Sequence, residues 1–495
     1  MRLAELVAAV PGARVVRPGP TAPSDPLAIE VTHVAPRADL AEPGEVFVCV
    51  RGVRVDGHDL AGEAVGRGAG VLVVERPLDL DVAQVLVPDA RSAVALIASE
   101  LAGRPADRLT VVGVTGTNGK TTSAYILRAV LEASGRQCGL MGTVESIVGG
   151  TAEPTTHTTL DPVALHRAFA RMVAAGDRAC AMEVSSHALA QHRVAGVPFA
   201  AAVFTNLSRD HLDYHSDLDD YFAAKRRLFV RDAGEGDNPP ATVNLDDPYG
   251  RRIAEARDVL GYAIVNGADV RPSAYRQHAT GLWARVDTPR GPLEIESRLR
   301  GRFNLANILG AVGVGELLDL SHHDVAAGIA SLAGVAGRME AIDAGQPFQV
   351  LVDYAHTPDS LRNVLVAARE LAGDHRVGVV FGCGGDRDRG KRPQMGAVAA
   401  ELADIATVTS DNPRSEDPEE IIREIVAGME TGQAERRIEP DRRTAIGDTM
   451  ALMRAGDVLI IAGKGHERGQ DVGGVVHPFD DRAVARELLG ARQCA

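Results

Sequence analysis

The segment at residues 111–122, VVGVTGTNGKTT, constrains the fold more than any other part of this chain. An apolar, β-branched run breaks into a loop that contains Gly116 and Gly119, and Lys120 follows at the expected start of a helix. Glycines let backbone N–H groups approach phosphate oxygens, and a helix N-terminus adds a positive dipole. The segment therefore predicts a strand, a phosphate-binding loop and a helix, the core of a nucleotide-binding α/β domain.

Within this loop, Lys120 would neutralise β/γ-phosphate charge and Thr121 would offer its hydroxyl to Mg²⁺. The spacing departs from the standard Gly-x-x-x-x-Gly-Lys-[Ser/Thr], because Val114 occupies the place of the first glycine. The alternative is a tight turn with a solvated lysine, which the coincidence of glycines, lysine and tandem threonines after a strand disfavours. The residues expected to bind phosphate are Gly116, Thr117, Asn118, Gly119, Lys120, Thr121 and Thr122.

Length and composition limit the class of protein. The 495 residues suggest about three domains. Hydrophobic residues make up 45% and charged residues 24%, so neither disorder nor membrane insertion is expected. A formal charge of −14 argues against a nucleic-acid partner. The five cysteines are scattered without a Cys-x-x-Cys pair, and Glu5 interrupts the N-terminal apolar stretch. Both features favour the cytoplasm over secretion. We expect a monomer.

Two breaks in the pattern divide the chain into three expected α/β domains. They fall at the polar segment 103–107 and near the segment 332–338. We expect a small N-terminal domain over 1–106, a central domain with a mostly parallel sheet over 107–335, and a Rossmann-like domain over 336–495. In the last domain, Thr357 and Asp417 precede prolines as helix caps, and Glu420 is expected to complete a capping box.

Polar clusters follow two expected strands of the central domain. Glu183 ends the strand expected at 179–184, and His211 follows the one at 201–205. Because open α/β sheets bind ligands at the carboxyl ends of their strands, both side chains are candidates to face Mg²⁺. Taken alone, four residues would equally suit zinc in a hydrolase: Asp210, His211, Asp213 and His215. A phosphate-binding loop in the same domain favours Mg²⁺.

The motifs in their order resemble those of the Mur ligases, and within that family the members that add the third amino acid to the peptidoglycan peptide. The match runs from about residue 110 to about residue 482. Its motifs are MEVSSH at 182–187, QHRV at 191–194, FTNLSRDHLDYH at 204–215, YFAAKRRLF at 221–229, GRFN at 301–304, DYAHTP at 353–358, FGCGGDRDRGKRP at 381–393, DNPR at 411–414 and GKGHE at 463–467.

The resemblance implies ATP-dependent amide ligation, in which a carboxylate attacks the γ-phosphate and an amine then displaces phosphate from the acyl phosphate. Because carboxylate and triphosphate repel each other, the site needs cations: Lys120, Mg²⁺ held by Thr121 and Glu183, and a second Mg²⁺ near His211. The lysine of the family that matches Lys225 is carbamylated and orients Mg²⁺. The alternative for Lys225 is a solvated helix lysine.

The resemblance also implies nucleotide contacts outside the loop. Asn307 matches the family's adenine contact, and Asp353 and His356 match the ribose–phosphate end. Arg338 matches an arginine that reaches from the C-terminal domain to phosphate. Each residue has a structural alternative, namely a capping or core contact for the first three and a linker ion pair for the arginine.

The DNPR motif implies that the amino acid is meso-diaminopimelate. A second amino-acid head needs a planar cation for its carboxylate and an acceptor for its ammonium. Arg414 with Arg387 would supply the first and Glu467 the second, whereas the alternative for Arg414 is a surface ion pair with Glu416 or Asp417. Further matching positions are Asp411, Asn412, Pro413 and Gly463.

The expected nucleotide-sugar end carries fewer matches. Where the family has Asp-Ser-Arg, this chain has Arg37-Ala38-Asp39, without the serine hydroxyl. The residues that match contacts to UDP-muramoyl-dipeptide are Thr158, Thr159, Ser185, Gln191 and Arg193. Three alternatives stay open: a ligase of the same kind that joins another carboxylate and amino acid in a specialised pathway, a metallohydrolase, and a nucleotide-binding regulator.

Overall fold

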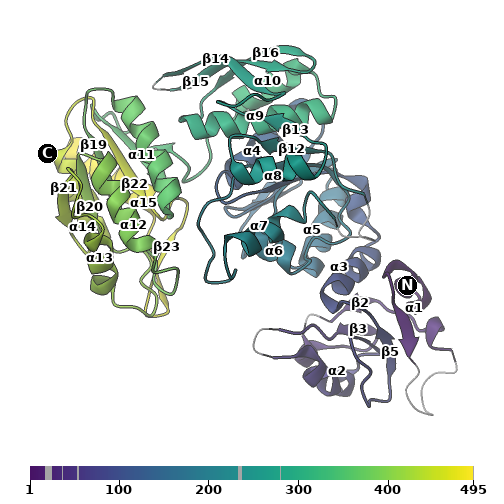
Figure 1. Ribbon diagram of the computed structural model, residues 1–495. Coiled ribbons are helices and arrows are strands. Elements are labelled where there is room, and N and C mark those ends of the chain that lie inside the picture. The colour runs from purple at the N-terminus through teal and green to yellow at the C-terminus, as the bar shows by residue number, and fades with distance from the viewer. Residues whose placement is uncertain (17–24, 36, 53–54, 232–236, 279, 494–495) are drawn as a thin grey trace. The chain divides into compact units, whose positions relative to one another are not determined.

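The computed structural model describes residues 1–16, 25–35, 37–52, 55–231, 237–278 and 280–493 (Figure 1). The chain forms two compact units, each of which is discontinuous in sequence. The first unit contains Met1–Thr115, Gly135–Val203 and Ala224–Ala241, and the second contains Gly116–Ser134, Phe204–Ala223 and Thr242–Ala495. No helix within the described residues is long and apolar enough to cross a membrane. The two domain boundaries expected from the sequence stay predictions.

The first unit contains a five-stranded sheet near the N-terminus, in the order β1-β5-β4-β3-β2. All neighbouring pairs are parallel except that of β1 with β5. Successive side chains of β3 alternate: Val46 and Val48 pack with α1 and α3, whereas Phe47 packs with α2. The elements are α1 (Leu3–Ala9), β1 (Arg14–Val16), β2 (His33–Val34), β3 (Glu45–Val48), α2 (Ala61–Arg67), β4 (Val71–Val74), β5 (Ala83–Leu86) and α3 (Ala90–Leu101), with short 3-10 turns at Pro26–Ala28, Ala38–Leu40, Gly57–Leu60 and Pro105–Arg108.

A second sheet of this unit holds the strand before the phosphate-binding loop. This unit contributes the strands β11-β6-β10-β7-β8-β9 to it, in that order, and β10 is parallel to both β6 and β7. The carboxyl ends of β6, β7 and β10 therefore lie at one edge, where ligands bind in such sheets. The elements are β6 (Thr110–Thr115), β7 (Cys138–Met141), β8 (Ser146–Val148), β9 (Thr151–Glu153), α5 (Pro162–Ala174), β10 (Ala179–Glu183), α6 (Ser186–Ala190) and β11 (Phe199–Phe204).

The second unit begins with the helix after the loop. Helix α4 packs against α9 and α10, β12 pairs in parallel with β13, and β14, β15 and β16 form an antiparallel sheet. Helix α7 contributes residues to both units. The elements are α4 (Lys120–Ala133), α7 (Leu218–Arg226), β12 (Ala241–Asn244), α8 (Pro248–Ala256), β13 (Leu260–Tyr262), β14 (Arg271–His278), β15 (Gly281–Thr288), β16 (Gly291–Ser297), α9 (Arg302–Leu317) and α10 (His322–Ser331).

The C-terminal part of the second unit is a six-stranded sheet between helices, in the order β17-β18-β22-β19-β20-β21 (Figure 1). Ile460 packs with α11, α12 and α13, and its neighbours Leu459 and Ile461 pack with α14 and α15. The elements are β17 (Glu340–Ala341), β18 (Gln349–Asp353), α11 (Pro358–Ala372), β19 (Val377–Phe381), α12 (Lys391–Leu402), β20 (Ile405–Val408), α13 (Pro418–Ala427), β21 (Glu435–Ile438), α14 (Arg442–Leu452), β22 (Val458–Ala462), β23 (Gly469–Val472), β24 (Val475–Pro478) and α15 (Asp481–Gln493). The expected α/β class is confirmed.

Both expected helix starts of this part are confirmed, and one detail is wrong. Thr357 and Ser360 form a reciprocal capping box at α11, with N–H to Oγ distances of 3.2 and 3.0 Å. Asp417 caps α13 by accepting the N–H two residues on at 2.9 Å. Glu420 completes no capping box, because its carboxylate instead lies 3.6 Å from Arg423 one turn further along the exposed helix face.

Candidate functional site

The loop between β6 and α4 requires glycine at two positions, because a neighbouring side chain lies very close to the backbone at each of them. Gly119 has a φ of 87°, and a Cβ there would lie 2.4 Å from Oδ1 of Asn307 on α9. Gly116 has a φ of 152°, and its Cβ would lie 1.9 Å from Oγ1 of Thr205. No side chain fits at either position. The structure thus places Asn307, the expected adenine contact, directly against the loop.

The ammonium of Lys120 lies over this loop. Its Nζ donates hydrogen bonds to the carbonyl oxygens of Gly116 at 2.9 Å and Thr117 at 2.8 Å. The segment after β11 supports the same loop, because the backbone N–H groups of Thr117 and Asn118 donate to Asn206 at 2.9 Å each. Strand, loop, helix and lysine are therefore arranged as the sequence predicted, with a cation at the N-terminus of α4.

Asn118 connects the loop to the start of α11. Its Nδ2 donates to Oδ2 of Asp359 at 2.9 Å, and Oγ of Ser208 donates to the same oxygen at 3.2 Å. The sequence did not single out Asp359, although its place in the first turn after the Thr357 cap marks a helix start. Two helix N-termini, those of α4 and α11, therefore contribute to one polar cluster in the second unit.

Arg338 reaches Thr121 of the phosphate-binding segment, and the phosphate contact expected of it stays a prediction. Its Nη2 donates to Oγ1 of Thr121 at 2.9 Å, and its guanidinium carbon lies 4.6 Å from the ring centroid of Tyr354. Nε of Arg338 is buried without a hydrogen-bond partner among the residues that the structure describes. A buried, unsatisfied donor beside Lys120 fits an anionic ligand such as a triphosphate.

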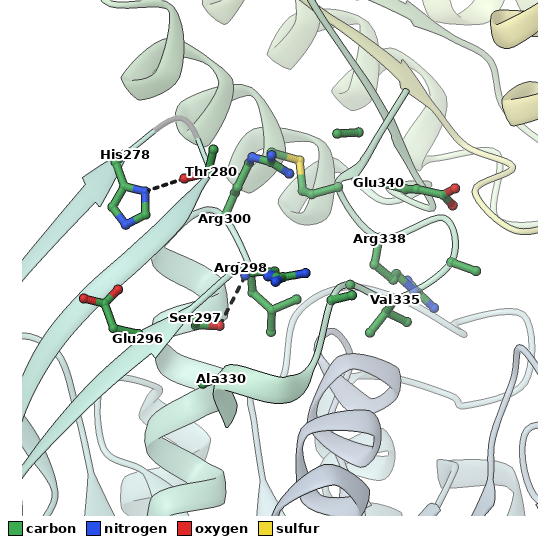
Figure 2. Close-up of a pocket in the computed structure, with 16 residues that line it drawn as sticks. His278, Thr280, Glu296, Ser297, Arg298, Arg300, Ala330, Val335, Arg338 and Glu340 are labelled. Atoms are coloured by element: carbon green, nitrogen blue, oxygen red, sulfur yellow. Dashed lines mark hydrogen bonds between the residues drawn. The ribbon is translucent and has the colours of Figure 1, made fainter. Parts of the chain in front are cut away.

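Arg338 also lines a pocket of about 800 Å³ in the second unit (Figure 2). One wall is the segment that leads from α10 to β17, which carries Val335, Arg338 and Glu340, and the other is the chain that leaves β16, which carries Arg298 and Arg300. Three arginines thus surround a cavity that adjoins the phosphate-binding loop through Arg338. The sequence did not predict Arg298 or Arg300 as lining residues.

Asp353 and Asn307 make structural contacts. The buried carboxylate of Asp353 accepts the N–H groups of Met339 at 2.7 Å and Ala355 at 2.8 Å, and burial raises its pKa against the opposing charge of Arg338. The linker just after Arg338 is therefore held by Asp353. Asn307 donates from Nδ2 to Oδ1 of Asn304 at 3.0 Å. The structural alternatives given for these residues are thus realised, whereas their nucleotide roles stay predictions.

His356 and Asp210 lie near each other in the second unit. Nδ1 of His356 lies 2.9 Å from the carbonyl oxygen of Tyr354, which can only accept a hydrogen bond, so in the neutral ring Nδ1 carries the hydrogen and Nε2 carries none. Nε2 lies 4.0 Å from Oδ2 of Asp210. Burial, together with the charge of Lys391, lowers the pKa of His356 to about 4. Burial acts to raise the pKa of Asp210, but His211, His356 and Lys391 outweigh it and lower that pKa to about 2.

His211 adopts a left-handed backbone conformation with a φ of 55°. Its N–H donates to Oδ1 of Asp210 at 2.9 Å, its Nε2 lies 3.4 Å from Oδ2 of the same residue, and its ring packs edge-on against Tyr221. Such strain in a non-glycine residue is typical of functional sites. The zinc alternative gains no support, because the part of the chain that the structure describes contains no group of three His, Cys, Asp or Glu residues arranged to hold a metal.

In the first unit, Glu183 lies at the end of β10, as predicted. Its Oε1 accepts the N–H of Thr143 at 2.7 Å, and its Oε2 accepts the hydroxyl of Thr143 at 3.1 Å. The hydroxyl of Thr158 is 3.0 Å from that of Thr143. Thr143 was not predicted, although it follows the neighbouring strand β7 and the strand-end rule that identified Glu183 applies to it equally.

The other residues predicted for the muramoyl-dipeptide form one network with Glu183. The hydroxyl of Thr159 donates to the carbonyl oxygen of Glu183 at 2.9 Å and accepts the N–H of Ser185 at 3.0 Å. Arg193 donates from Nη1 to the Thr159 carbonyl oxygen at 2.9 Å and from Nη2 to Oε1 of Gln191 at 2.9 Å. Ser185 also caps α6, which was its structural alternative. The structure thus brings these sequence-distant residues together, and their contact with the dipeptide stays a prediction.

Lys225 is buried, with 1% of its surface exposed. The alternative of a solvated helix lysine is therefore wrong, because a buried ammonium costs free energy that solvent does not offset. Glu183 and Lys225 belong to the first unit, whereas Lys120, Thr121 and His211 belong to the second. A magnesium site that joins them stays a prediction. Oxygen donors such as the Glu183 carboxylate and the Thr121 hydroxyl suit that metal.

A charged cluster joins the DNPR and GKGHE motifs in the second unit. Lys464, fully buried, donates to Oδ1 of Asn412 at 2.9 Å and lies 3.2 Å from Oε2 of Glu467. Nδ2 of Asn412 donates to the same Glu467 oxygen at 2.8 Å. Gly463 approaches Asp411 so closely that a Cβ would lie 2.3 Å from Oδ2. The substrate roles expected of Asn412 and Glu467 stay predictions. The sequence missed Lys464, whose place inside a matched motif was the available signal.

Arg414 makes no surface ion pair with Glu416 or Asp417. Its Nη1 donates to the carbonyl oxygen of Gly385 at 2.6 Å, and Glu416 instead pairs with the buried Arg392 at 2.8 Å. Arg387 is exposed in the same loop and donates to its own neighbour's carbonyl oxygen at 3.0 Å. The two arginines expected to bind a carboxylate therefore both lie at the loop that contains Gly384 and Gly385.

The first unit has its own large pocket, of about 1060 Å³. Its lining comes from the N-terminal sheet and from the segment around β8, β9 and α5, and it includes Arg37, Ala38 and Asp39. Arg37 and Asp39 pair with each other at 2.7 Å on the exposed side. The segment that replaces the family's Asp-Ser-Arg thus lines a cavity large enough for a nucleotide sugar.

Three family models match the chain. They are "Mur ligase family, catalytic domain" at residues 34–108, "Mur ligase middle domain" at 114–315 and "Mur ligase, glutamate ligase domain" at 337–465. The UDP-N-acetylmuramoyl-L-alanyl-D-glutamate--2,6-diaminopimelate ligase of Geobacillus kaustophilus is 46% identical over 454 residues, 91% of this chain and 93% of its own.

Solved structures are also similar. One, of a UDP-N-acetylmuramoyl-L-alanyl-D-glutamate--2,6-diaminopimelate ligase, has a TM-score of 0.70 at 31% identity and covers 100% of this chain and 99% of its own. Another, the MurF ligase of Thermotoga maritima in complex with ADP, has a TM-score of 0.62 at 20% identity and covers 94% and 99%. The second likeness shows the fold alone.

Proposed function

The chain belongs to the Mur ligase family, and from this premise we propose that it joins meso-diaminopimelate to the γ-carboxylate of D-glutamate in UDP-N-acetylmuramoyl-L-alanyl-D-glutamate. ATP would activate that carboxylate, and the product would enter peptidoglycan synthesis. The family confirms the resemblance noted in the motifs. The activity is that named for the relative from Geobacillus kaustophilus.

One observation supports the choice of amino acid: the cluster of Asn412, Lys464 and Glu467 with Arg414 beside it. A diaminopimelate molecule has a second head with one carboxylate and one ammonium. Arg414 and the exposed Arg387 would bind the carboxylate through charge-assisted hydrogen bonds, and Glu467 would accept the ammonium. Lysine lacks the distal carboxylate, so it would leave Arg414 without that partner.

The phosphate-binding loop supports the activation step. The D-glutamate carboxylate would attack the γ-phosphorus while ADP leaves, and the amine of diaminopimelate would then attack the acyl carbon while phosphate leaves. Lys120 and Arg338 would offset the negative charge that accumulates when a carboxylate approaches a triphosphate. The buried Nε of Arg338 would gain the phosphate oxygen that it requires as an acceptor.

Magnesium would bind to the hydroxyl of Thr121, the carboxylate of Glu183, His211 and a carbamylated Lys225, and it would screen the triphosphate. Carbamylation would turn the buried ammonium of Lys225 into an anion, which suits a lysine held away from solvent beside a cation. In this structure the Thr121 hydroxyl accepts a hydrogen bond from Arg338.

The first unit would bind the nucleotide-sugar substrate. The network of Thr159, Ser185, Gln191 and Arg193 lies at the carboxyl edge of β10, where it would contact the dipeptide. The pocket that Arg37 lines would take the UDP end. A ligase that joins another carboxylate stays the second candidate, because Arg37-Ala38-Asp39 offers an ion pair where the family offers a serine hydroxyl.

A phosphate-release assay tests the proposal. The purified protein is given ATP, Mg²⁺ and UDP-N-acetylmuramoyl-L-alanyl-D-glutamate, with either meso-diaminopimelate or L-lysine as the amine. We expect phosphate release that requires all three substrates and is at least tenfold faster with diaminopimelate. Equal rates with lysine would contradict the assignment of Arg414.

The same assay separates the alternatives. A metallohydrolase would act without ATP and would stop when zinc is chelated. A nucleotide-binding regulator would bind ATP without amine-dependent phosphate release. A ligase for another carboxylate would release no phosphate with the UDP-linked dipeptide, whatever amine is supplied. Mass spectrometry of the tripeptide product would confirm the bond formed.

A further inference from the structure

The β23–β24 hairpin lies directly against the DNPR motif. Four hydrogen bonds connect them: Gln470 Nε2 to the Asp411 carbonyl oxygen at 2.7 Å, the Asp471 N–H to Asn412 Oδ1 at 3.0 Å, the Arg414 N–H to the Asp471 carbonyl oxygen at 3.0 Å, and the Gly473 N–H to the Arg414 carbonyl oxygen at 2.7 Å. Strand β23 pairs with β24 on its other side. Arg414 therefore pairs with the hairpin through an isolated parallel β-bridge to Val472.

The hairpin bonds both backbone groups of Arg414, which has a φ of 52°. A left-handed conformation costs a non-glycine residue about 1 kcal/mol, so an arginine adopts it only where its surroundings require it. Asp471 accepts from its N–H and Gly473 donates to its carbonyl oxygen, which fixes the peptide groups on either side of the Cα. These two bonds determine the direction in which the Arg414 side chain leaves the backbone.

In that direction the guanidinium of Arg414 lies against Gly384 and Gly385. Nη1 of Arg414 donates to the Gly385 carbonyl oxygen, and a Cβ on Gly384 would lie 2.9 Å from that nitrogen. A rotation of the Arg414 backbone would remove the guanidinium from this narrow position. Its remaining N–H groups would then no longer converge with Arg387 on a ligand carboxylate.

The hairpin adds little to the core of the protein. Val475 and Val476 on β24 are 57% and 67% exposed, and neither belongs to a buried cluster. The hairpin begins two residues after Glu467, so one short element adjoins both residues proposed for the distal head of the amino acid. Its contacts with the DNPR motif, rather than hydrophobic packing, account for its place in the fold.

We propose that the β23–β24 hairpin determines specificity for the amino acid, with Asp471 and Gly473 as residues that position Arg414. The inference rests on the proposed function and extends it to residues outside the matched motifs. Both residues would act through the backbone of Arg414 rather than through a contact with the substrate. Their effect should therefore appear in the KM for the amino acid and nowhere else.

The test is a set of variants in the phosphate-release assay. In Gly473→Pro the N–H that bonds Arg414 is lost, and proline cannot adopt the φ of 63° at this position. We expect a KM for diaminopimelate raised about tenfold, the loss of roughly one hydrogen bond, with the KM values for ATP and the UDP-linked dipeptide within twofold. Gln470→Leu, which keeps the backbone intact, is expected to raise the same KM about threefold.

Two controls belong to the same hairpin. Gly474→Ala introduces strain at a φ of 82° but keeps the Gly473 N–H, and Val476→Thr changes an exposed side chain. Both are expected to leave every KM within twofold. A change as large as that of Gly473→Pro in either control would overturn the proposal, because the cause would then be general disturbance of the hairpin.

A double variant makes the test specific to Arg414. If Gly473 acts through that side chain, Arg414→Ala/Gly473→Pro has the same KM for diaminopimelate as Arg414→Ala alone, within about threefold. A further tenfold rise would refute the proposal. If Arg414→Ala itself leaves this KM unchanged, the proposed role of Arg414 fails. If Arg414→Ala raises the KM for diaminopimelate but Gly473→Pro and Gln470→Leu leave it unchanged, the role of the hairpin fails and the proposed function stands.

Discussion

Two adjacent arginines on α14 offer a direct measure of what burial does to an ion pair. Arg442 pairs with Asp481 at 2.7 Å, and both side chains are fully buried. Arg443 pairs with Glu487 on the same helix α15, but these side chains are 44% and 65% exposed. Replacement of each arginine by alanine removes the same chemical group from neighbouring positions. The two variants differ in the exposure of the carboxylate that is left.

The expected magnitude follows from the contacts of Arg442. Its Nε and Nη2 donate to both oxygens of Asp481 at 2.8 and 2.7 Å, and Nη2 also donates to the Ala462 carbonyl oxygen at 2.9 Å. Removal of one partner of a buried pair costs about 3 to 5 kcal/mol, because a charge stays buried without compensation. At about 1.4 kcal/mol per factor of ten, this is roughly 10² to 10⁴ in a local opening equilibrium.

Hydrogen exchange of the full chain, followed by mass spectrometry, measures that equilibrium in β22 and α15 separately from other regions. In Arg442→Ala we expect exchange of these peptides to accelerate by about 10² to 10⁴, and in Arg443→Ala by less than about threefold. In Arg442→Met/Asp481→Leu most of the loss is expected to be recovered, since an apolar pair of similar volume leaves no buried charge.

Two outcomes would refute this reasoning. Equal acceleration in Arg442→Ala and Arg443→Ala would mean that burial does not set the cost. An acceleration in Arg442→Met/Asp481→Leu as large as in Arg442→Ala would mean that the isolated Asp481 carboxylate is not the cause. The lost bond to the Ala462 carbonyl oxygen would then account for the effect.

Three further predictions concern the proposed site and the core. Arg338→Ala should weaken ATP binding about tenfold by isothermal titration calorimetry, because one charge-assisted contact to phosphate is lost; unchanged affinity would remove Arg338 from the nucleotide site. Lys225→Ala should lower turnover at saturating substrates at least about 100-fold, and full turnover would contradict its catalytic role. His166 is buried with both ring nitrogens unpartnered among the described residues, and burial lowers its pKa to about 4. Protonation of His166 therefore favours the unfolded chain, so the free energy of unfolding falls by up to about 3 kcal/mol as the pH drops from 6.5 to 4. The His166→Leu variant should accordingly show a smaller decrease in thermal midpoint between pH 7 and pH 5 than the wild type.

Much of the site was predictable because its signals are local. The glycines of the phosphate-binding loop, the cap at Thr357 and the strand end at Glu183 each depend on a few consecutive residues, and the structure confirms their conformations. The prediction of a capping box at Glu420 was wrong, because so short a pattern does not show whether the glutamate side chain will pair with Arg423 instead.

Other features have no local signal. The burial of Lys225 has no signal in the adjacent residues, since Arg226 and Arg227 suggested an exposed helix face. Thr143 reaches Glu183 because β7 and β10 are neighbours in the sheet, which strand order decides. Pairing of strands across long separations is a tertiary event, so a linear pattern does not contain it.

The sequence by itself determined which chemistry is present: a loop that suits phosphate, carboxylates and hydroxyls that suit a hard cation, and charged motifs that suit a doubly charged amine. Only the tertiary structure decided the position and orientation of those groups. Arg414 takes its direction from a hairpin 57 residues further on, where Asp471 accepts its N–H. The physical reason is that residue type sets charge and hydrogen-bonding capacity, whereas direction comes from backbone contacts made after the chain has folded.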